Sequence, residues 1–154
     1  MVAVVALAIA AAILVLYPLR HLSQAMTTTS EPCSPQPCAA PQGFEADLHN
    51  ISLEAGILRM SATFRNRTTG GFEAVSYRHT SLADFQLRGA DGQQSRPVVS
   101  ALCPAWPELK VERGASRGPV PLCFRAPSGN FHSAQLIWSP DLGLLFDDVQ
   151  IALR

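Results

Sequence analysis

Residues 102–124, from Leu102 to Phe124, read LCPAWPELKVERGASRGPVPLCF. The stretch contains two of the four cysteines, Cys103 and Cys123, and several Pro and Gly residues that favour turns. At 109–111 and at 120–124, apolar side chains alternate with other residues, which is the period-two pattern of strands with one buried face. We therefore predict two strands joined by a turn and linked by a Cys103–Cys123 disulfide, within an exported all-β domain.

The same alternation places Cys123 on the face of its strand opposite the apolar side chains. We therefore expect the Cys103–Cys123 disulfide to lie outside the core and to hold the loop 104–107 against the strand. Trp106 lies between two prolines of that loop. We predict that Trp106 is exposed and contacts a partner, because aromatic residues on fixed loops are common in interfaces.

The most regular strand pattern is at Ile57 to Arg65. From Leu58 onward its even-numbered residues are apolar and its odd-numbered residues are polar, which predicts a half-buried antiparallel strand. Shorter patterns predict further strands at 45–53 (with a bulge at His49-Asn50), 83–88, 98–102, 109–111, 120–125, 134–138 and 149–153. Turn signals recur at a spacing of roughly ten residues, so the sequence predicts an antiparallel β-sandwich of about seven to eight strands over residues 44–154.

The run from Val2 to Tyr17 is apolar and contains no charged residue, Ser or Thr. As a helix it would be about 24 Å long, slightly shorter than a ~30 Å hydrocarbon core. Ser23-Gln24-Ala25 then offers the small residues of a signal-peptidase site. We expect residues 1–25 to be a signal peptide, cleaved near Ala25, or an uncleaved membrane anchor, and the rest of the chain to be extracytoplasmic.

Residues 26–43 are rich in Pro, Ser and Thr, so we expect a disordered linker between the export segment and the folded domain. Four cysteines in a small exported protein favour disulfides over a metal site. Three pairings are open from the sequence, and proximity along the chain favours Cys33–Cys38 within the linker and Cys103–Cys123 within the domain.

Three segments carry a resemblance to a known family: LRMSATFRN at 58–66, DFQLRGADG at 84–92, and the glycine turn, apolar strand and Phe-x-x-Pro pattern of 109–127. Together they resemble bacterial cell-envelope proteins with the immunoglobulin-like domain of unknown function 4352 (DUF4352), whose fold is shared by the secreted mycobacterial antigen of the MPT63 type. The resemblance covers roughly Glu45 to Arg154. It implies an immunoglobulin-like sandwich and carries over no catalytic residue.

The residues that could act in catalysis or bind a metal are scattered along the chain. The four histidines, at 21, 49, 79 and 132, form no H-x-H or HExxH pair, and no G-x-S-x-G motif occurs. Asp141, Asp147 and Asp148 form the densest acidic group, which we interpret as charges that protect the edge of the last strand. We therefore expect no catalytic, cofactor or metal residues.

The formal net charge is zero, which disfavours nucleic acid as a partner. The first hypothesis is a non-catalytic binding module of the cell envelope, not an enzyme, with an unknown protein or envelope component as its partner and with membrane contact through its N-terminal segment. A second hypothesis is a metal carrier or hydrolase that assembles His79, His132 and an Asp from distant strands. A third is a structural spacer.

Overall fold

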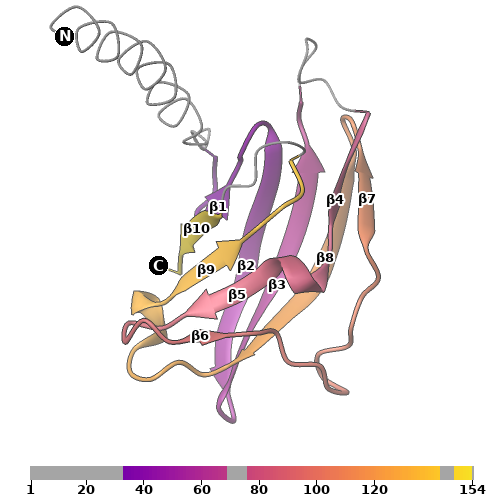
Figure 1. Cartoon of the computed structure of the whole chain (residues 1–154). Coiled ribbons are helices and arrows are strands. Elements are labelled where there is room, and N and C mark those ends of the chain that lie inside the picture. Colours follow the sequence, from indigo (N-terminus) through magenta and orange to yellow (C-terminus); the bar gives the residue numbers. More distant parts are fainter. Residues whose placement is uncertain (1–32, 69–75, 143–147, 154) are drawn as a thin grey trace, which may run out of the picture.

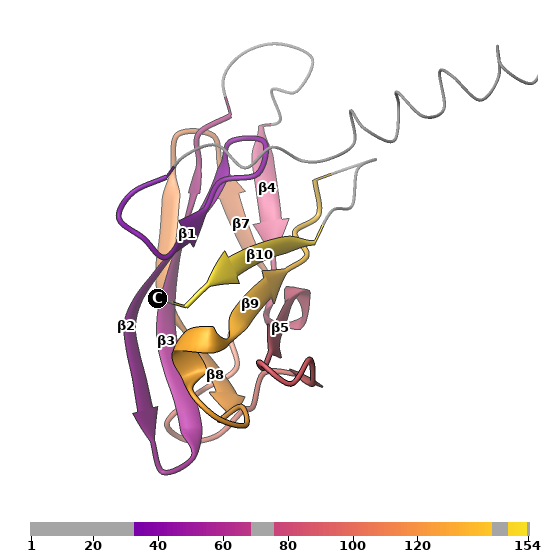
Figure 2. The same cartoon turned by 90° about the vertical axis from the view of Figure 1, so that its left-hand side faces the viewer.

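The computed structural model describes residues 33–68, 76–142 and 148–153. It is an antiparallel β-sandwich in which the sheet β1-β2-β3-β8 packs against the sheet β10-β9-β5-β6, while β4 and β7 form a separate two-stranded sheet (Figure 1). Figure 2 shows the two larger sheets as two layers. The strands span β1 (Cys38–Ala39), β2 (Phe44–Glu54), β3 (Ile57–Asn66), β4 (Tyr77–Thr80), β5 (Phe85–Arg88), β6 (Gln94–Ser95), β7 (Leu109–Glu112), β8 (Ser116–Arg125), β9 (Gln135–Trp138) and β10 (Val149–Ala152).

The inner face of the first sheet follows the predicted alternation. On β3, the four apolar residues from Leu58 to Phe64 are fully buried, and they face Leu122 and Phe124 of the neighbouring β8. The predicted bulge in β2 is confirmed, because the register with β3 shifts between His49 and Ser52. The described residues form ten strands rather than seven or eight. β1, β4 and β6 are additional, of which β1 and β6 are pairs of residues too short to recognise in a sequence, and no strand spans 98–102.

Aromatic rings join the two layers. Trp138 of β9 stacks on Phe85 of β5, with planes 1° apart, and it also contacts Phe44 and Phe64 of the opposite sheet at centroid distances of 5.1 and 5.8 Å. The indole N–H of Trp138 donates to the hydroxyl of Thr80 on β4 at 3.2 Å, so its polar group is satisfied inside the core. The alternation of β9 predicts this core position correctly.

The folded part begins earlier than residue 44. Residues 26–43 are predicted to be a disordered linker, but Cys38–Ala39 forms β1 and pairs with β2, and Ala39 is 2% exposed within the core. The Leu48 N–H donates to the Pro37 carbonyl at 3.0 Å, which fixes this segment further. The linker prediction is therefore wrong for residues 33–43, because strand pairing with β2 and the burial of Ala39 and Ala40 hold this proline-rich segment against the sheet.

The expected signal peptide or anchor at 1–25, and residues 26–32, lie outside the described residues. In the part of the chain that the structure describes, no helix is long and apolar enough to cross a bilayer. The two helices there are 3-10 turns of three residues, η1 (Leu82–Asp84) and η2 (Phe131–Ser133).

The strands on either side of Gly114 do not form the predicted hairpin. β7 pairs with β4, whereas β8 pairs with β3, so the two strands belong to different sheets. Asn66, the last residue of β3, holds this junction: its side-chain amide donates to the Val111 carbonyl at 3.1 Å, and its own carbonyl accepts from the Gly114 N–H at 2.7 Å. Alternation along a strand does not reveal which strand lies beside it.

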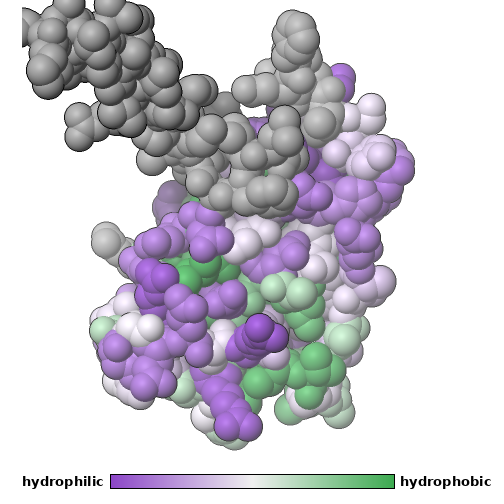
Figure 3. Space-filling model, viewed as in Figure 1, coloured by the Kyte–Doolittle hydropathy of each residue, from purple (hydrophilic) through white to green (hydrophobic). Residues whose placement is uncertain are grey.

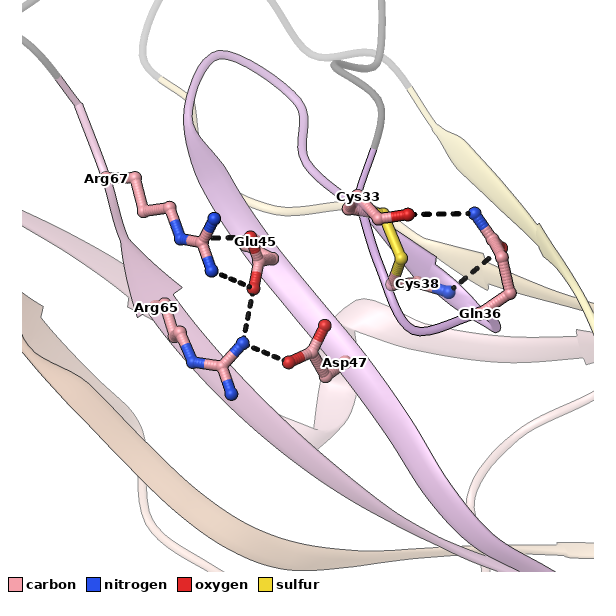
Figure 4. Close-up of a disulfide and its surroundings, with 7 residues drawn as sticks. All are labelled: Cys33, Gln36, Cys38, Glu45, Asp47, Arg65 and Arg67. Atoms are coloured by element: carbon pink, nitrogen blue, oxygen red, sulfur yellow. Dashed lines mark hydrogen bonds and ion pairs between the residues drawn. A yellow bond between two sulfur atoms is a disulfide. The ribbon is translucent and has the colours of Figure 1, made fainter.

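A buried charge cluster covers the outer face of the first sheet near β1 (Figure 4). Glu45 and Asp47 of β2 are 2% and 4% exposed. Arg65 of β3 donates to Glu45 at 2.5 Å and also to Asp47, and Arg67 forms a bidentate pair with Glu45 at 3.1 Å. The Glu45 hydrogen bond, together with both carboxylates, raises the pKa of Arg65. Each buried acid therefore has a cationic partner, as burial of charge requires.

Candidate interaction surface

Strand β8 is an edge strand, and the segment between β6 and β7 (residues 96–108) covers its free edge. The Val98 N–H donates to the Cys123 carbonyl at 2.8 Å, and the Trp106 indole N–H donates to the Pro121 carbonyl at 2.9 Å. Both acceptors belong to alternate residues of β8, whose carbonyls point away from β3. The segment therefore blocks pairing with another chain along part of an exposed edge.

The Cys103–Cys123 disulfide is the second link between this segment and β8. It has an S–S distance of 2.07 Å, and both cysteines are buried. Cys123 is paired with Arg59 of β3, on the outer face of the sheet, and it does not belong to the hydrophobic core cluster. The predicted pairing and its position outside the core are confirmed, as is the Cys33–Cys38 pairing.

Trp106 is partly buried, so the full exposure predicted from its flanking prolines is wrong. Its ring packs at the edge of the core, 6.2 Å from the ring of Phe64 and 6.4 Å from that of Phe85. The chain passes from the disulfide on the outer face, around the edge of β8, to the inner face. Trp106 therefore attaches the loop to the core.

The exposed large apolar residues of the loop are Val99 and Leu102, which we group with the residues between them as the 99–102 turn. Ser100 and Cys103 exchange two backbone hydrogen bonds of 3.0 Å, which close the turn. Val99 is 60% exposed and Leu102 is 75% exposed. Figure 3 shows an apolar patch at the lower right, over the segment between β6 and β7. The sequence prediction of a strand at 98–102 is wrong, because these residues pair across a turn.

The histidines lie apart from this surface. His49 hydrogen-bonds the Thr63 hydroxyl at 3.2 Å, and His79 lies 3.4 Å from the Glu108 carboxylate. His132 lies in η2, where its ring contacts Phe131. Within residues 33–68, 76–142 and 148–153, no group of three or more His, Cys, Asp or Glu is placed to hold a metal ion. His21 and Asp147 fall outside these ranges.

A second exposed aromatic lies on the sheet of β4 and β7. Tyr77 is 46% exposed; the Lys110 ammonium lies 4.1 Å from the centre of its ring, and His79 meets the ring edge-on. An open hollow of about 510 Å³ borders Tyr77, Lys110 and Glu112. Because Lys110 and His79 already contact the ring, this site offers a ligand less apolar surface than the 99–102 turn does.

These features define an antiparallel β-sandwich that exposes a disulfide-held apolar turn at an edge strand. No protein-family model matches the sequence, and no curated protein matches it either. Among solved structures, the fold is similar to that of the yjhA protein from Bacillus subtilis, with a TM-score of 0.53, 13% sequence identity and coverage of 73% of this chain and 93% of that chain. At this identity the similarity shows the fold alone.

Proposed function

We propose that this protein is a non-catalytic binding module of the cell envelope and that the 99–102 turn is its contact surface. The observation that carries the proposal is the exposure of Val99 and Leu102 on a turn held by a disulfide and two hydrogen bonds to one strand. Covering such a side chain in an interface is worth about 1.5–3 kcal/mol.

The links to β8 also lower the cost of binding. Ordering a flexible side chain or loop at an interface costs about 0.5–1.5 kcal/mol for each immobilised group. In this turn the backbone is already fixed on both sides, by Val98 before it and by Cys103 and Trp106 after it. The side chains of Val99 and Leu102 are exposed and add little buried area to the core, so their presence on a fixed turn favours a role in recognition.

The proposed location is outside the cytoplasm. Two disulfides are compatible with an oxidising compartment. The apolar run at 2–17 supports export, either as a signal peptide cleaved near Ala25 or as a membrane anchor. The resemblance to DUF4352 proteins supports the same proposal.

The other two hypotheses have less support. A metal carrier or hydrolase needs His79, His132 and an Asp in one cluster, and the described residues contain no such cluster. A purely structural spacer does not require exposed apolar side chains at a fixed turn, and such side chains promote association with other molecules.

The test is chemical cross-linking in intact cells that express the full chain, followed by purification and mass spectrometry. We expect the V99S/L102S variant to lose the specific adducts of the natural chain. The matched control is L53S, which removes another exposed leucine, 46% exposed at the end of β2. Loss of the same adducts in L53S, or their retention in V99S/L102S, would contradict the proposal.

A further inference from the structure

Two arginines flank the 99–102 turn on the outer face of the first sheet. Arg59 of β3 is paired directly with Cys123, whose sulfur holds the turn, and Arg125 is two residues further along β8. Alternate residues of a strand share a face, so Cys123 and Arg125 point to the same side. Diagonal neighbours across two strands are about 7–8 Å apart, so both guanidinium groups can reach a partner that covers the turn.

A third arginine precedes the turn. Arg96 follows β6 directly, and the next residues lead to Val98, which bonds to β8 at Cys123. Arg59, Arg96 and Arg125 are all exposed. Within the described ranges, none of the three makes an ion pair.

At the other end of the same sheet face, an arginine does have acidic partners. Arg65, also on β3, is bound by the buried carboxylates of Glu45 and Asp47. Arg59 instead lies between Ser52 and Cys123 in the register of the sheet, and both neighbours are neutral. Glu54 is in the row of Arg125, separated from it by Ile57. Among the described residues, Arg65 and Arg67 near β1 are thus paired with carboxylates, whereas Arg59 and Arg125 form no ion pair.

We propose that the 99–102 turn and its flanking arginines bind an acidic segment of a partner polypeptide that inserts an apolar side chain against Val99 and Leu102. This inference rests on the proposed function and specifies the chemistry of the partner. Guanidinium groups pair with carboxylates in bidentate geometry, while the turn supplies the apolar contact. Arginine is enriched among the residues that dominate interface energies.

The position of the turn favours a polypeptide over an anionic lipid surface. The described chain begins at Cys33, beside β1, and Cys38 is in register with Asp47 and Thr63. The turn is attached at Cys123, in register with Arg59, further toward the opposite end of β3 (Figure 1). An N-terminal segment held in a membrane would therefore hold the end of the sandwich that is remote from the turn.

The test uses an array of random 12-residue peptides made of Leu, Phe, Asp, Glu, Lys, Arg, Ser and Gly, probed with the purified, fluorescently labelled full chain. We expect the bound peptides to be enriched in Asp or Glu next to Leu or Phe, with the acidic preference weaker at ~0.5 M salt. L102S should lower binding about tenfold, whereas L53S should not. R59S/R125S should remove the acidic preference and keep the apolar one.

Each other outcome is decisive. If binding depends on Leu102 but shows no acidic preference, the inference about the partner is wrong while the proposed contact surface stands. If no binding depends on Leu102, both fail. Sedimentation with vesicles of phosphatidylcholine and phosphatidylglycerol tests the lipid alternative. If the chain binds these vesicles, R59S/R125S does not, and the peptide array shows no acidic preference, the surface binds an anionic lipid and not a polypeptide.

Discussion

Gly118 illustrates how a single residue fixes the edge strand that carries the turn. Its φ of +117° lies in a region that L side chains rarely adopt, and a Cβ at this position would be 2.6 Å from the Ala62 carbonyl oxygen of β3. The register between β3 and β8 shifts at the same level, between Ala62 and Phe64. Only glycine allows the two backbones to approach this closely.

The substitution Gly118→Ala should therefore destabilise the fold by about 2–4 kcal/mol, since it adds a backbone clash to an unfavourable φ. Gly92→Ala is the matched control, because Gly92 has a φ of +79° and no atom within 4 Å of an added Cβ. Gly92→Ala should lower the unfolding free energy by about 1–2 kcal/mol, because only the unfavourable φ contributes. Urea unfolding measures both, and equal losses would show that the contact with Ala62 is unimportant.

Arg65 is the second residue whose removal should be costly. Arg65→Met leaves Asp47 without its ion-pair partner while that carboxylate stays buried. We expect the unfolding free energy to fall by about 2–3 kcal/mol. This is at the low end of the range for breaking a buried ion pair, because the Arg65 side chain is 36% exposed and water screens the pair. Arg59→Met, on the same strand without an ion pair, should change the unfolding free energy by less than about 0.5 kcal/mol. Similar losses in both variants would contradict the assignment of the cluster.

At the scale of elements, the central feature is the attachment of the 96–108 segment to β8. The Cys103–Cys123 disulfide closes a loop with a sequence separation of 20. Restricting the unfolded chain in this way is worth about 3 kcal/mol. The bond also fixes the turn in the folded state, because it lies directly after Leu102.

The variant C103A/C123A should therefore lose about 3 kcal/mol of unfolding free energy and exchange the amide hydrogens at positions 100 and 103 faster than the natural chain. The matched control is C33A/C38A, whose loop has a sequence separation of only 5. That control should leave exchange at the turn unchanged. Unaltered exchange in C103A/C123A would show that the hydrogen bonds of Val98 and Trp106 are sufficient to hold the turn.

The elements also show what local pattern can predict. The alternation at 57–65 predicts β3 because one buried face dictates apolar residues at every second position, and the same rule places Cys123 outside the core. It cannot predict that β7 pairs with β4, since pairing depends on distant residues such as Asn66. The exposed Val99 and Leu102 are missed for a related reason: apolar side chains predict burial, and only the disulfide and the turn hydrogen bonds reveal that these are held outward.

For the whole molecule, the structure combines a two-layer core with a segment at 33–43 that joins one sheet through β1 and an apolar turn attached to an edge strand. Mass spectrometry of the chain purified without reductant should find Cys33–Cys38 and Cys103–Cys123 linked, in agreement with the structure. The same spectrum determines the N-terminus, and cleavage after Ala25 predicts a chain that begins at Met26. Four free thiols in the natural cell would contradict the proposed extracytoplasmic location.

The most direct test of the proposed contact surface is site-specific photo-cross-linking in intact cells, with a photoreactive amino acid at position 102 and, in separate strains, at positions 53 and 150. Gln150 is exposed on β10, in the opposite sheet. We predict a discrete adduct from position 102 that is absent from the other two positions and is weakened in the C103A/C123A background. Adducts of equal yield from all three positions, or none from position 102, would contradict the assignment of the 99–102 turn as the binding surface.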